Sequence, residues 1–154
     1  MLERYRTSGL ALFVYYFFMY VAMAPFTAFL STYYNEIGLS ASEIGILSGI
    51  GPIVVIFGQF AWGRMADQAK HKNTVLLIAT LLTGATIFAF SLHPSFIYLL
   101  GINILYNFTN CSIIQLSDSI ALEYATGHNL RFSIIRMGGS IGFSCCTLAV
   151  GFPR

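Results

Sequence analysis

The sequence has very little charge. Only 9% of its 154 residues are Asp, Glu, Lys or Arg, whereas an average soluble domain carries about 25%. Hydrophobic residues make up 56% of the chain, and a soluble protein of this size would expose much of that apolar surface in large patches. We therefore expect lipid to be the solvent. The net charge is only +2 and no basic stripe is present, which argues against nucleic acid as a partner.

Several sites that carry chemistry are also missing. Cysteine is scarce, and the spacing of Cys111, Cys145 and Cys146 matches no zinc or redox motif, which favours small packing residues in helices. The chain has no Gly-x-x-x-x-Gly-Lys-Ser/Thr phosphate loop, no Gly-x-Ser-x-Gly nucleophile motif and no cluster of metal-ligand residues. We expect no metal, no cofactor and no enzymatic activity, and a membrane-embedded enzyme is the least favoured interpretation.

The sequence does contain long charge-free windows. A bilayer core about 30 Å thick is crossed by about 20 apolar residues in a helix. The first window is too long for the apolar region of a signal peptide, which has about 7–15 residues. The windows predict an all-α polytopic membrane protein with about five transmembrane helices. The predicted spans are residues 10–34, 44–62, 74–92, 96–123 and 133–152.

Local signals refine these helices. Pro25 lies within the first span and is expected to kink it. Ser42 is expected to cap the second span, with Glu43 beside the positive helix end. Glycines four residues apart allow two helices to approach closely in lipid. Two such pairs occur, Gly45 with Gly49 and Gly138 with Gly142.

The basic residues predict the orientation. Of the eight Lys and Arg residues, all except Arg154 fall on or near one side of the predicted spans, and the opposite loops, residues 35–43 and 93–95, contain none. Short loops rich in Lys and Arg stay cytoplasmic. We expect an integral protein of the plasma (inner) membrane with a cytoplasmic N-terminus.

Two ionisable residues fall inside predicted spans. Asp118 lies near the cytoplasmic end of the fourth span, and Arg136 lies about one turn inside the fifth. Each costs about 2.5–3.5 kcal/mol on insertion scales unless it faces a partner or a water-filled cavity. Because these spans are antiparallel neighbours, both residues lie at similar depth and could pair or bind a polar ligand. Alternatively, Arg136 reaches the interface and Asp118 meets another basic residue.

Polar side chains also recur along the fourth span. Asn103, Asn107 and Asn110 follow helical spacing, and Asp118 falls roughly on the same face. A polar stripe on a membrane helix faces a bundle or a cavity. Hydrogen bonds between helices and contact with a substrate explain the stripe equally well.

A charged segment separates the second and third predicted spans. Gly63 permits a sharp exit from a helix, and the Asp67 carboxylate can accept hydrogen bonds from a helix N-terminus or a basic side chain. From the residues alone, this loop could equally be a topology anchor. Residues 63–72, GRMADQAKHK, resemble the motif Gly-x-Leu-Ala-Asp-Arg-x-Gly-Arg-Arg/Lys between helices two and three of the major facilitator superfamily.

The match includes Gly63, Ala66, Asp67 and Lys72, whereas residues 68, 70 and 71 depart from the pattern. The loss of the second glycine, at residue 70, puts the tight turn of the motif in doubt. In that superfamily the motif concerns conformational switching. The resemblance therefore implies a gating role for Gly63, Asp67 and Lys72.

Residues 136–143, RMGGSIGF, resemble the fifth helix of the lactose-permease-like and phenylpropionate-permease-like symporters. In those families a carboxylate on helix four precedes the helix-five Arg by 18 residues, as Asp118 precedes Arg136. The resemblance implies that this pair lines the substrate cavity. The aromatic first span is similar too, which makes Tyr16 and Tyr20 weaker cavity candidates, together with Asn110.

The resemblance implies transport of a small polar or anionic solute by ion-coupled alternating access, with protons as the expected ion. In that fold two six-helix halves rock around a central site. The chain would form an incomplete N-terminal six-helix bundle, and its C-terminal partner half is missing. Since the sequence stops at the end of a span, we suspect truncation. The alternative is a truncated, non-transporting membrane protein such as an assembly factor or a regulatory remnant.

Overall fold

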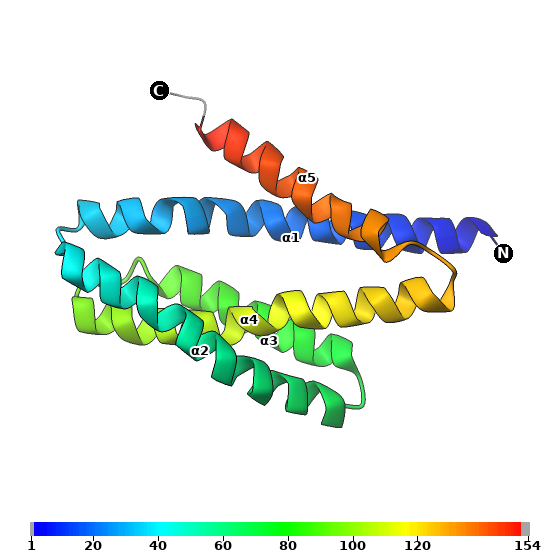
Figure 1. Ribbon diagram of the computed structural model, residues 1–154, viewed down its shortest axis with the longest axis horizontal. Coiled ribbons are helices and arrows are strands. Elements are labelled where there is room, and N and C mark those ends of the chain that lie inside the picture. The colour runs from blue at the N-terminus through cyan, green and yellow to red at the C-terminus, as the bar shows by residue number, and fades with distance from the viewer. Residues whose placement is uncertain (1, 152–154) are drawn as a thin grey trace. The chain divides into compact units, whose positions relative to one another are not determined.

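The computed structural model describes the backbone of residues 2–151 and the side chains of residues 9–149 (Figure 1). The side chains of Arg4, Arg6 and Arg154 and the predicted end of the fifth span at residue 152 lie outside the described residues. The described backbone forms five α-helices and no strand. The helices are α1 (Leu2–Glu36), α2 (Ala41–Gln68), α3 (Lys72–Ala89), α4 (Phe96–Gly127) and α5 (Phe132–Gly151).

All five helices are long and apolar enough to cross a membrane. The side chains of Phe57, Phe60 and Phe88 are 69%, 78% and 71% exposed, and a water-soluble protein would bury such rings. The prediction of an all-α polytopic membrane protein with five spans is confirmed. Lipid tails form no hydrogen bonds, so a backbone that spans the membrane must satisfy its own N–H and C=O groups. An α-helix does this within one segment.

The short connection between α1 and α2 is built from local hydrogen bonds. Gly38 follows α1 with a φ of 81°, the left-handed conformation that ends many helices. The N-cap of α2 is Ser40, so the prediction of Ser42 is wrong. The Ser40 hydroxyl accepts from the Glu43 N–H at 3.4 Å, and the Glu43 carboxylate accepts from the Ser40 N–H at 2.8 Å. This reciprocal capping box satisfies two donors that Ser42 could not satisfy with the same Glu43.

The connection between α2 and α3 is shorter than the sequence predicted. The expected loop beginning at Gly63 is wrong, because α2 continues to Gln68 and only residues 69–71 separate it from α3. A glycine inside a helix costs about 1 kcal/mol relative to alanine. Here Trp62 and Ala66, on either side of Gly63, are buried, and their packing holds the helix together past the glycine. Gly63 and Asp67 are therefore helical, and Lys72 is the first residue of α3.

The chain divides into two compact units. The terminal unit comprises Met1–Tyr33 and Ala121–Arg154, and the central unit comprises Tyr34–Ile120. Most of α1, the end of α4 and all of α5 belong to the terminal unit. The central unit contains α2, α3 and most of α4.

In the central unit, α2 packs closely on α4. The indole N–H of Trp62 donates to the backbone carbonyl of Phe108 at 2.7 Å. One turn earlier, a Cβ on Gly58 would lie 2.7 Å from the Cys111 sulfur, so only glycine permits this approach. The contact explains the packing role that the sequence predicted for Cys111.

Candidate functional site

In the terminal unit, α1 and α5 touch at backbone distance. A Cβ on Gly138 or Gly142 would collide with a backbone carbonyl of α1, so the close contact predicted for this glycine pair is confirmed. Successive contacts advance by four residues on both helices, which means that α1 and α5 run in the same direction in register (Figure 1). The contacts are Gly138 with Phe13, Gly142 with Phe17, and Cys146 with Val21.

The other glycine pair behaves differently. A Cβ added to Gly45 or Gly49 would meet no atom within 4 Å. The prediction that these two glycines admit a neighbouring helix is therefore wrong for the part of the chain that the structure describes. Spacing alone does not distinguish the two pairs, since both have the same four-residue interval.

The contact between Cys146 and Val21 follows from a proline. Pro25 has no N–H, so the carbonyl of Val21, four residues earlier, loses its normal helical donor. The Cys146 thiol donates to this carbonyl at 3.6 Å. A thiol is a weak donor, but the bilayer interior offers no water in its place. α1 continues through Pro25 to Glu36.

Tyr16, on α1, is completely buried in the terminal unit. Its side chain is 0% exposed and packs with Ala121, Ala125 and Ile135 in the core of the terminal unit. The sequence suggested that Tyr16 lines a solute cavity, and that role stays a prediction. Its described surroundings are those of a side chain that shapes the helix packing.

Tyr20 and Arg136 lie along the same pair of helices. The Tyr20 ring covers Gly139, where a Cβ would lie 2.6 Å from a ring carbon. Arg136 lies on α5 one turn before Gly139 and directly after the buried Ile135, and its own side chain is exposed. Three of the predicted site residues, Tyr16, Tyr20 and Arg136, thus belong to one helix pair.

In the central unit, the polar stripe on α4 is partly used for packing. Asn103 is 3% exposed, and its amide donates to the backbone carbonyl of Leu47 on α2 at 2.6 Å. Asn107 in turn donates to the Asn103 side chain at 2.9 Å. For Asn103, a hydrogen bond between helices is therefore the correct one of the two explanations. Pro52 on α2 has no N–H, so the carbonyl of residue 48, directly after Leu47, loses its helical donor. Near such a proline, a neighbouring helix commonly supplies hydrogen-bond donors.

Asn110 and Asp118 continue this helix and are both half-buried. The ammonium group of Lys72, at the start of α3, donates to the hydroxyl of Ser119 at 3.5 Å. Ser119 directly follows Asp118 in the sequence, so a predicted gating residue contacts the helix position after a predicted solute-binding residue. Asp67 is exposed on the last turn of α2. Asp118 and Arg136 belong to different units, and their pairing stays a prediction.

These side chains offer a carboxylate, a guanidinium, an amide and phenol rings. Such groups bind polar solutes reversibly through charge-assisted hydrogen bonds. Within the described residues, no group of three His, Cys, Asp or Glu side chains could hold a metal ion. Each of these groups, taken within its own unit, is suited to recognising a polar group inside a membrane.

A family model matches residues 10–152, which include part of every helix. The chain belongs to the MFS_1-like family. It is 34% identical over 138 residues to the "Uncharacterized transporter YwbF" of Bacillus subtilis, covering 89% of this chain and 35% of the relative. It is 31% identical over 140 residues to the maltose permease of Geobacillus stearothermophilus, covering 90% and 36%.

A third relative of this MFS_1-like chain is the probable 3-phenylpropionic acid transporter of Escherichia coli K12. The two are 26% identical over 128 residues, which cover 83% of this chain and 33% of the relative. The chain therefore spans about a third of the length of these curated relatives. No solved structure matches it with statistical significance.

Sequence reasoning missed several local features of this MFS_1-like chain, although signals for them were present. Ser40 and Glu43 have the Ser-x-x-Glu spacing of a capping box. The interval between Gly138 and Gly142 continues to another small residue, Cys146. The sequence does not show which helix packs against these three small residues.

Proposed function

We propose that this MFS_1-like chain is part of a secondary transporter that moves a small polar or anionic solute across the membrane. Transport proceeds by alternating access and is driven by an ion gradient, with protons as the coupling ion. The observation that carries this proposal is the family match over residues 10–152, supported by relatives named as a maltose permease and a probable 3-phenylpropionic acid transporter. The chain contributes five helices of an N-terminal bundle and works with a C-terminal half that completes the fold.

Asp118 and Arg136 are the proposed solute-binding pair. A hydroxyl of a sugar can donate to the Asp118 carboxylate and accept from the Arg136 guanidinium. A carboxylate solute can bind the guanidinium through two parallel hydrogen bonds. The two named solute types of the relatives, a sugar and an aromatic acid, are therefore the first to test.

Other residues act around this pair. Tyr20, half-buried on the helix pair that carries Arg136, offers a ring face and a hydroxyl to the solute, while Tyr16 and Asn110 shape the cavity. Lys72 links the start of α3 to α4 beside Asp118. A movement of α3 during gating, in which Gly63 and Asp67 take part, would therefore change the surroundings of the Asp118 carboxylate.

The test is uptake of radiolabelled maltose and of 3-phenylpropionate by vesicles that contain the complete transporter, with and without an imposed pH gradient. We expect Asp118→Asn and Arg136→Gln to lower uptake about 10- to 100-fold, the range for a lost hydrogen bond to a charged group. Glu123→Gln and Lys70→Gln are matched controls, because both remove an exposed charge. We expect these controls to retain uptake.

The outcomes separate the parts of the proposal. If Asp118→Asn transports as well as Glu123→Gln, the binding-site assignment is wrong and transport itself stands. If collapsing the pH gradient leaves the rate unchanged, protons are not the coupling ion. If no solute moves under any imposed gradient, transport is wrong, and a non-transporting remnant becomes the better description.

A further inference from the structure

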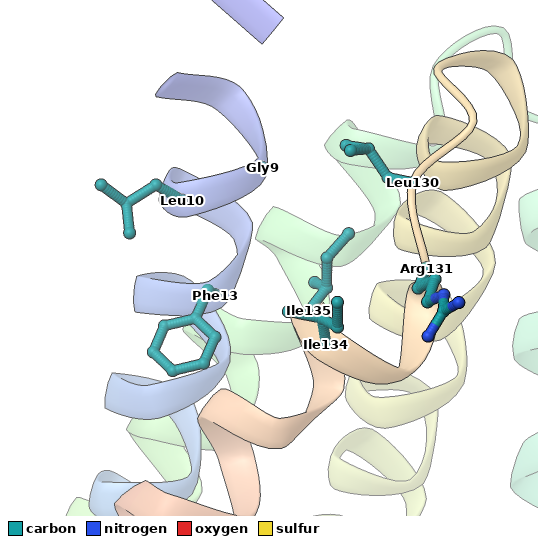
Figure 2. Close-up of a pocket in the computed structure, with 7 residues that line it drawn as sticks. All are labelled: Gly9, Leu10, Phe13, Leu130, Arg131, Ile134 and Ile135. Atoms are coloured by element: carbon teal, nitrogen blue, oxygen red, sulfur yellow. The ribbon is translucent and has the colours of Figure 1, made fainter. Parts of the chain in front are cut away.

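The terminal unit contains a cavity of about 350 Å³ that lies beside one end of the α1–α5 contact (Figure 2). None of the predicted solute-binding or gating residues lines it. The lining side chains come from the first turns of α1, from the connection between α4 and α5, and from the start of α5. They are Gly9, Leu10, Phe13, Leu130, Arg131, Ile134 and Ile135.

The cavity opens where the glycine series on α5 ends. The four-residue register that joins Phe13 with Gly138 pairs Gly9 with Ile134 one turn earlier. At residue 134, α5 carries a branched isoleucine instead of a glycine, and the cavity lies at this position of the α1–α5 contact. A Cβ on Gly9 would meet only the tip of the Leu130 side chain, at 3.4 Å.

The walls of the cavity are apolar and partly open to the surroundings. Leu10 is 61% exposed, Ile134 is 56% exposed and Leu130 is 39% exposed. These exposed apolar side chains form the mouth of the cavity. Sites of about 300–1,000 Å³ with apolar walls and few polar groups are typical of small-molecule binding.

The charge at the cavity has one sign. Arg131 is the only charged residue among the seven that line it, and Figure 2 shows it at the start of α5, next to Ile134 and Ile135. The N-terminal end of α5 adds the partial positive charge of a helix start. The cavity thus combines an apolar interior with one basic side chain at the start of a membrane helix, where headgroups lie.

We propose that this cavity binds an anionic phospholipid, with part of an acyl chain against Phe13 and Ile134 and the phosphate at Arg131. The apolar walls match a hydrocarbon chain, and the Arg131 guanidinium complements the negative headgroup. Basic pockets between membrane helices are a known means of holding anionic lipids. This inference requires that the protein lies in a membrane with the mouth of the cavity open to lipid, and it does not depend on the solute proposed above.

The experiment is native mass spectrometry of the purified protein with added phosphatidylglycerol or phosphatidylcholine of identical acyl chains. We expect about five-fold more bound phosphatidylglycerol, since one basic residue near an anionic headgroup contributes about that factor. Arg131→Gln removes this excess and leaves the phosphatidylcholine adducts unchanged. Arg64→Gln is the matched control, because it removes an exposed arginine on α2, and we expect the excess to remain.

A second variant tests the apolar part. Gly9→Leu places a side chain in the hollow, and we expect it to reduce the adducts of both lipids. Circular dichroism checks that its helix content is unchanged, and Ile134→Phe fills the same space if Gly9→Leu does not fold. Equal binding of the two lipids, an equal effect of Arg64→Gln, or undiminished binding to both cavity-filling variants would each overturn the proposal.

Discussion

At the scale of single residues, the Val21 carbonyl shows how a proline is accommodated inside a membrane helix. Pro25 removes the donor for this carbonyl, and the Cys146 thiol from α5 takes its place at 3.6 Å. The thiol is useful only because the proline is present. The two residues should therefore be energetically coupled, although 121 positions (146 − 25) separate them in the sequence.

A double-mutant cycle measures this coupling. We expect Cys146→Ala to lower the free energy of unfolding by about 0.5–1 kcal/mol, the usual range for a hydrogen bond in a membrane protein. In a Pro25→Ala background the new N–H satisfies Val21, so Cys146→Ala should cost less. Unfolding in mixed micelles with increasing sodium dodecyl sulfate provides the measurement.

Two controls accompany the cycle. Cys146→Ser keeps a donor and should retain most of the stability, whereas Cys145→Ala changes an exposed neighbour and should have little effect. An identical cost of Cys146→Ala with and without Pro25 would show that the thiol acts only through packing.

The sequence predicted individual polar residues better than their partners. Asn103 was recognised as inward-facing, but its acceptor, the backbone carbonyl of Leu47, carries no residue-specific signal. Asp118 and Arg136 stand out in the sequence because charges are rare in membrane spans, and their role stays a prediction. Two serines, Ser40 and Ser42, lie near the start of α2, and only their spacing from Glu43 shows that Ser40 is the cap.

At the scale of helices, the contact between α1 and α5 depends on the absence of two side chains. Gly138 and Gly142 bring the α5 backbone against carbonyls of Phe13 and Phe17. These atoms cannot move aside as a flexible side chain could. Any larger residue at either glycine therefore has to push the two helices apart.

We expect Gly138→Ala and Gly142→Ala each to lower the free energy of unfolding by about 1–3 kcal/mol, the cost of overpacking a tight contact. Gly45→Ala and Gly49→Ala are matched controls, since nothing lies within 4 Å of either added methyl group. Alanine favours a helix more than glycine does, so the controls should be neutral or stabilising by up to about 1 kcal/mol. The same unfolding assay applies, and four equal effects would contradict the contact.

The existence of the helices could be predicted from the sequence, and their ends could not. A charge-free window shows where lipid requires a helix, and each of the five windows contains one helix, although α3 ends at Ala89, three residues before the end of its window. The ends depend on packing and caps. α2 passes Gly63 because Trp62 and Ala66 are buried, a fact that no local pattern contains.

At the scale of the whole molecule, the common direction of α1 and α5 agrees with a chain that crosses the membrane alternately. The Lys and Arg bias predicts that the α2–α3 connection lies in the cytoplasm and the α3–α4 connection on the opposite side. This orientation can be tested in cells.

The test uses single cysteines in a background carrying Cys111→Ser, Cys145→Ser and Cys146→Ser. We expect a membrane-impermeant maleimide to label Ser95→Cys on intact cells and Lys70→Cys only after permeabilisation. Both residues are exposed. Labelling of Lys70→Cys from outside would reverse the predicted orientation.

The pairing of α1 with α5 also has a consequence in time. Phe13 and Gly138 lie 125 positions apart (138 − 13) in the sequence, and a ribosome adds about 5–20 residues per second. During synthesis, α1 therefore waits in the bilayer for about 6–25 s before the glycine face of α5 emerges. Throughout that interval the carbonyl of Val21 lacks the Cys146 thiol that replaces its normal helical donor. A chaperone or insertase that binds unpaired membrane helices would therefore have to hold the first span longer than any later one.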